Sequence, residues 1–216
     1  MAEGPRRRKI RPNGHVLSLR EFVAPRSFDA GTGGAIVDFY VMAEAISAEG
    51  FETGLHRLWR RIDTGRPTAA VIARIAEHLS RKISGLKADI LRKAIQETLF
   101  HAAGIGYGPQ PLNVKVGLEK FLRKRGSKKL LELFLSSYVF NTVWIRMQDA
   151  VRMKLGSRFL TNSIIAIERF CVSVVKSVLS EWDAAGKLDE LPTKRRLGST
   201  LIKTIQARLV ENPIHL

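Results

Sequence analysis

The chain has 216 residues, of which 45% are hydrophobic and 26% are charged, proportions typical of a globular protein that can bury a sizeable core. Its net charge of +16 is far from balanced, and a charge of this size favours association with polyanions. The longest apolar runs contain Glu132, Glu168 or Arg169, which argues against a membrane-spanning helix, so we expect no membrane partner.

The first thirty residues are rich in arginine and proline and poor in apolar side chains. Such a segment cannot bury enough apolar surface to order itself, so residues 1–30 are predicted to form a basic, largely irregular arm. A short strand or docking arm within residues 16–23 is one exception that the pattern allows. An organellar transit peptide is an alternative reading of the same composition. The basic cluster of the arm consists of Arg6, Arg7, Arg8, Lys9 and Arg11.

Residues 29–34 are glycine-rich and precede an apolar run over residues 35–46. This order predicts a flexible loop that opens a helix, and free N–H groups at a helix start can bind an anion. No Gly-Lys-Ser/Thr follows, and the glycine spacing is not that of a dinucleotide-binding loop. We therefore interpret the segment as a helix entry rather than a nucleotide site.

Apolar residues at helical spacing predict further helices over residues 51–62, 67–83 and 85–103. The glycines and prolines of residues 104–112 end this series and form a candidate hinge. A basic helix is expected over residues 114–125, where Gly126 stops it. A long central helix over residues 127–154 follows, and its first half is apolar nearly all round, which indicates burial on several sides.

Two amphipathic helices are expected over residues 162–184 and 199–211. The prediction is thus an all-α fold of about six to eight helices around one long helix, with residues 31–216 forming a single helical domain. Neither a strand pair nor an internal repeat is expected. Cys171 and the three tryptophans lie on apolar stripes and are predicted to be core residues.

The excess positive charge is concentrated in three blocks rather than spread evenly. Residues 1–20 carry six basic and one acidic residue, residues 114–158 carry eleven and three, and residues 193–216 carry five and one. We expect the cations of residues 115–129 to form one outward-facing strip that contacts phosphates without reading sequence. The predicted nucleic-acid-binding residues are those of the arm cluster together with Lys120, Arg123, Lys124, Arg125, Lys128 and Lys129.

The function expected from these features is that of a non-catalytic accessory subunit, which binds the backbone of DNA or RNA within an intracellular multi-protein complex. A lone cysteine excludes a disulfide framework and favours a reducing, cytoplasmic setting. One alternative is a scaffold whose basic blocks dock on an acidic partner surface. A second is a nuclease or nucleotide-dependent enzyme that uses residues 29–34 or the Glu97/His101 pair. We expect no cofactor, because the spacing of Glu97 and His101 departs from that of inward-facing metal ligands in helical bundles.

Overall fold

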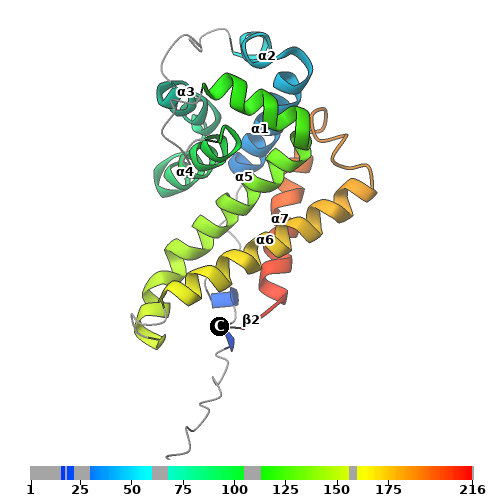
Figure 1. The fold of residues 1–216 in the computed structure, drawn as a ribbon. Coiled ribbons are helices and arrows are strands. Elements are labelled where there is room, and N and C mark those ends of the chain that lie inside the picture. The colour runs from blue at the N-terminus through cyan, green and yellow to red at the C-terminus, as the bar shows by residue number, and fades with distance from the viewer. Residues whose placement is uncertain are drawn as a thin grey trace, which may run out of the picture.

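The computed structural model describes residues 16–17, 19–21, 30–59, 68–104, 113–155 and 160–215. The prediction of an all-α fold is confirmed, because the described residues form seven α-helices (Figure 1). In chain order the elements are β1 Val16–Leu17, the 3-10 helix η1 Leu19–Glu21, α1 Ala30–Glu49, α2 Phe51–Leu58, α3 Thr68–Ser80, α4 Gly85–Ala102, α5 Val114–Leu155, α6 Leu160–Ala184, α7 Arg196–Glu211 and β2 Ile214–His215.

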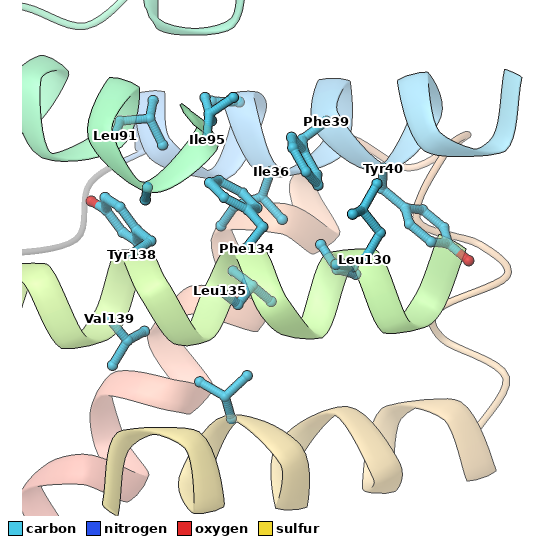
Figure 2. Packing of buried hydrophobic residues seen from close by; sticks show 14 of the residues in the cluster. Ile36, Phe39, Tyr40, Leu91, Ile95, Leu130, Phe134, Leu135, Tyr138 and Val139 are labelled. Atoms are coloured by element: carbon cyan, nitrogen blue, oxygen red, sulfur yellow. The ribbon is translucent and has the colours of Figure 1, made fainter. Parts of the chain in front are cut away.

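Helix α5 runs through the middle of the molecule and contacts α1, α2, α4 and α6 (Figure 1). Its buried side chains form two rows, because residues four apart stack along one face of a helix. Figure 2 shows Phe134 and Tyr138 pointing towards α1 and α4, whereas Val139 points to the opposite side, where α6 lies. Phe134 stacks on Phe39 of α1 with ring centroids 4.3 Å apart. The expected burial of the long helix on several sides is therefore confirmed.

The backbone breaks inside α5 at Gly126, as its sequence predicts. Gly126 has φ 76° and ψ 167°, a conformation open to glycine but strained for other residues. The break separates a first segment, residues 114–125, from the long segment, residues 127–155. We call the first segment the collar helix. The axis of the collar helix can therefore differ in direction from that of the long segment, and the collar helix lies beside α2 and α1 (Figure 1).

Helix α1 begins at Ala30, so the expected loop over residues 29–34 is wrong for all but its first position, which lies outside the described residues. The reason is a close crossing with α7. A Cβ on Gly33 would lie 2.5 Å from the backbone N of Ser199, and a Cβ on Gly198 would lie 2.2 Å from the backbone O of Gly33. Glycine here permits two helix backbones to touch, rather than loosening a loop.

The two ends of the described chain pair with each other. Strand β1 runs antiparallel to β2, with Val16 opposite His215 and Leu17 opposite Ile214. This pair departs from the expectation of no strand pair, but it agrees with the short strand or docking arm that the sequence pattern allows within residues 16–23. Leu19 in η1 is fully buried, so the described end of the arm is anchored in the core. The rest of the arm, including its basic cluster, lies outside the described residues.

The expected core residues divide into two groups. Cys171 is fully buried and Trp182 is 5% exposed, which confirms both as core. Trp59 and Trp144 pack against the core but stay partly exposed. Cys171 is held in the thiol form, because burial raises its pKa to about 12.

Candidate nucleic-acid interface

The collar helix is attached to the body of the protein by one apolar face. Val114, Leu118 and Leu122 are buried on that face. Its polar side is fastened to α2, because the Phe51 N–H donates to Glu119 Oε1 over 2.8 Å and Lys115 forms an ion pair with Glu52. These contacts fix which side of the collar helix faces solvent.

Four of the predicted phosphate-binding residues lie on that solvent side. Lys120, Arg123, Lys124 and Arg125 are all exposed. Within the described part of the chain, none of the four forms an ion pair. Residues three and four apart are neighbours on a helix surface, so Lys120, Arg123 and Lys124 form one patch. Arg125 follows Lys124 directly at the end of the collar helix. We call Lys120, Arg123, Lys124 and Arg125 the collar strip.

The next two predicted residues differ from the collar strip in their partners. Lys128 Nζ lies 2.5 Å from Asp183 Oδ1 and 3.1 Å from Asp189 Oδ1, at the end of α6 and beyond it. The hydrogen bonds that Lys128 donates to the carboxylates of Asp183 and Asp189 raise the pKa of its ammonium group. Lys129 Nζ lies 2.6 Å from Glu132 Oε1. Both ammonium groups already have carboxylate partners, and Lys128 also connects α5 to the chain that follows α6.

The arm cluster of residues 6–11 lies outside the described residues, so its position relative to the collar strip is not defined. Strand β1, where the described chain begins, lies at the end of the molecule opposite the collar helix (Figure 1).

A basic hollow, separate from the collar strip, lies at the start of two helices. It has a volume of about 550 Å³ and is lined by Lys82, Lys87 and Arg146, with Gly31 of α1 and Ser84 before α4 beside them. Helix starts carry partial positive charge, and their first N–H groups lack partners within the helix. The hollow therefore adds positive potential outside the collar strip.

The Glu97 and His101 pair lies in a shallow cleft of about 410 Å³ between α4, α5 and α6. Glu97 Oε2 accepts hydrogen bonds from Ser137 Oγ over 2.7 Å and from Asn141 Nδ2 over 3.0 Å. The carboxylate thus connects α4 to α5. Within the residues that the structure covers, no three His, Cys, Asp or Glu side chains gather closely enough to hold a metal ion.

A further hollow brings together residues that the sequence did not single out. It has a volume of about 670 Å³, and its polar and aromatic lining residues are Asp38, Trp59, His78, Arg81 and Arg195. They come from α1, the end of α2, the end of α3 and the residue before α7. No local pattern could have joined them, because they come from four places that are far apart in the sequence.

No known protein family, curated protein or solved structure matches this chain. Among the described helices, none combines the length and the apolar character that crossing a membrane requires.

Proposed function

We propose that the chain is a non-catalytic accessory subunit that binds the phosphate backbone of DNA or RNA through the collar strip. The observation that carries this proposal is that Lys120, Arg123, Lys124 and Arg125 are exposed and free of ion pairs in the described structure. An unpaired surface cation can neutralise a phosphate, and so release the counterions condensed on the nucleic acid, without first breaking an internal contact. The basic arm of residues 6–11 would add further contacts.

The proposal predicts binding that depends steeply on salt and weakly on sequence. On duplex DNA each neutralised phosphate adds about 0.9 to the slope of log affinity against log salt. Replacing Arg123, Lys124 and Arg125 by alanine should therefore lower that slope by about 2.7, since three phosphate contacts are lost. Fluorescence anisotropy with random-sequence duplex DNA and RNA over a range of KCl concentrations measures the slope.

A matched control distinguishes the effect of the collar strip on binding from the effect of total charge. Arg169 and Lys176 of α6 and Lys203 of α7 are also exposed, and none of them has an ion pair in the described structure. Replacing these three residues by alanine removes the same charge but should leave most of the slope of log affinity against log salt unchanged. Equal losses in the two triple variants would contradict a localised interface, and a wild-type chain that binds no nucleic acid at low salt would contradict the function itself.

The alternative of a protein scaffold is favoured by one specific observation. Ile165 and Val172 of α6 are 40% and 36% exposed and lie seven residues apart, hence on one face of the helix. A protein partner that contacts this face would survive nuclease treatment in a pull-down. We further propose a reducing intracellular location, which the single, buried Cys171 supports.

A further inference from the structure

The hollow around Trp59 has the size and the mixed lining of a small-molecule site. Its volume of about 670 Å³ falls within the range of roughly 300–1,000 Å³ that is usual for ligand pockets. Val37 and Val41 of α1 form part of its apolar wall. We call it the Trp59 pocket.

Two of the described residues that line the Trp59 pocket are arginines. Arg81, just after α3, is exposed and forms no ion pair in the described structure. Arg195, just before α7, donates from Nη2 to Asp38 Oδ1 over 2.7 Å, and its side chain remains 63% exposed. Two guanidinium groups therefore face one carboxylate among the described lining residues. A guanidinium offers five N–H donors in a planar fork that matches phosphate oxygens, and Arg195 uses one of its nitrogens on Asp38.

Two further lining residues of the pocket are aromatic. The indole of Trp59 lies against the imidazole of His78, with ring centroids 4.5 Å apart and planes tilted by 40°. Trp59 is only partly buried, so its ring contributes surface to the pocket. Burial, and then the charge of Arg81, lower the pKa of His78, which favours the uncharged form of its imidazole. The two rings are tilted against each other and form no single plane, and the exposed part of the Trp59 ring is an aromatic surface of the kind on which bases stack.

We infer that the Trp59 pocket binds a nucleoside 5′-phosphate unit, with the base against Trp59 and His78 and the phosphate at Arg81 and Arg195. The second oxygen of Asp38 is placed to accept a hydrogen bond from a sugar hydroxyl or an exocyclic amine. The basic hollow of Lys82, Lys87 and Arg146 differs because none of its described lining residues is aromatic. It would hold a phosphate without selecting a base. The ligand unit has two sources, a free nucleotide or the 5′-phosphorylated end of a strand.

Isothermal titration of the full chain with AMP, adenosine and inorganic phosphate tests this inference. AMP should bind, and adenosine and phosphate should each bind at least about tenfold more weakly. Adenosine lacks the contacts with the two arginines, and phosphate lacks the contacts with the two aromatic rings. Arg81→Ala should weaken AMP binding by about tenfold or more, in line with the loss of a hydrogen bond to a charged group. Trp59→Leu should weaken AMP and adenosine binding but leave phosphate binding unchanged.

The matched control is Arg74→Ala. Arg74 is an exposed arginine of α3, two turns before Arg81, and it pairs with Glu77 outside the pocket. This variant should bind AMP as the wild type does. Equal weakening by Arg74→Ala and Arg81→Ala would overturn the assignment, because both would then act through net charge alone. Circular dichroism of each variant checks that a loss of binding does not reflect unfolding.

A second comparison distinguishes the two possible sources of the ligand, a free nucleotide and the 5′-phosphorylated end of a strand. At high salt, where the collar strip contributes little, a short oligonucleotide with a 5′-phosphate is compared with the same strand ending in a hydroxyl. Binding of AMP indicates a free nucleotide, and binding of only the phosphorylated strand indicates a strand end. Binding of neither would overturn the inference.

The inference stands apart from the proposed backbone binding. The triple alanine variant of Arg123, Lys124 and Arg125 should keep its affinity for AMP while its affinity for duplex falls. Conversely, Arg81→Ala should keep the salt slope on duplex DNA. Failure of one proposal therefore leaves the other measurable.

Discussion

The crossing of α1 and α7 allows a sharp test, because two adjacent glycines of α1 face opposite environments. A Cβ on Gly33 would lie 2.3 Å from Ser199 Oγ and 2.7 Å from Ser199 Cα, whereas a Cβ on Gly34 would have nothing within 4 Å. The close atoms on α7 include backbone, so relief requires the two helices to move apart. Gly33→Ala and Gly34→Ala change the same atoms in the same helix, and only one of them meets an obstacle.

The magnitudes follow from opposing terms. Replacing glycine by alanine inside a helix stabilises the fold by about 0.5–1 kcal/mol, and this term is common to both variants. Overpacking at a close contact costs about 1–3 kcal/mol, and it applies to Gly33 alone. Gly33→Ala should therefore lower the free energy of unfolding by up to about 2.5 kcal/mol, while Gly34→Ala should raise it by up to about 1 kcal/mol, so the two variants should differ by about 1–3 kcal/mol.

Urea denaturation followed by far-UV circular dichroism measures both values. In a protein of this size, 1 kcal/mol corresponds to a change in Tm of about 2–4 °C, so thermal melts should separate the variants as well. If Gly33→Ala were as stable as Gly34→Ala, the close approach of α1 and α7 would be refuted. The helical assignment of residues 30–34, which depends on that contact, would lose its physical reason.

Three further outcomes are expected. Phe134→Ala should lower the free energy of unfolding by about 3–5 kcal/mol in the same urea assay, because the ring is fully buried and stacks on Phe39; a change below about 1 kcal/mol would contradict that packing. Cys171 should resist iodoacetamide in the native state at pH 8 and react once the chain is unfolded, as mass spectrometry would show, because burial raises its pKa to about 12. Native labelling at the unfolded rate would contradict it. The pKa of His78 is lowered in the folded state, so the unfolded chain binds its proton more readily. Stability should fall as the pH drops from about 6.5 through the lowered folded value, and His78→Gln should flatten this dependence in urea melts at several pH values; an unchanged slope would contradict the assignment.

Most of the fold could be predicted because its signals are local. Apolar residues recur at helical spacing in the amphipathic helices, and Gly126 marks the break in α5 where a positive φ is needed. The exceptions depend on distant contacts. Gly33 lies in a helix because Gly198 crosses it, and β1 forms because β2 lies beside it. Nothing near either segment in the sequence indicates its partner.

The candidate sites were less predictable for the same reason. A run of cations in the sequence shows where positive charge is concentrated but not which side chains are already neutralised. Lys128 pairs with Asp183 and Asp189, more than fifty residues further along the chain, and no spacing rule connects them. The Trp59 pocket likewise needs four elements to meet. Trp59 is predicted from its apolar stripe to be a core residue, whereas in the structure it packs against the core and also lines the edge of the pocket.

Some of the cations in residues 115–129 are paired with carboxylates and others are not, and this difference has a measurable consequence for binding. Residues 115–129 contain seven cations, and a count from the sequence would assign about 0.9 of salt slope to each, or about 6.3 in all. Lys115, Lys128 and Lys129 already pair with carboxylates, so they are expected to neutralise few phosphates and to release few of the counterions condensed on the nucleic acid. The run should therefore contribute about 3.6, all of it from the collar strip. Replacing the four strip residues by alanine should remove this contribution, while replacing the three paired lysines should change the slope by less than about 1. A larger change in the second variant would show that these ion pairs open when nucleic acid binds, and would make the whole run the binding surface.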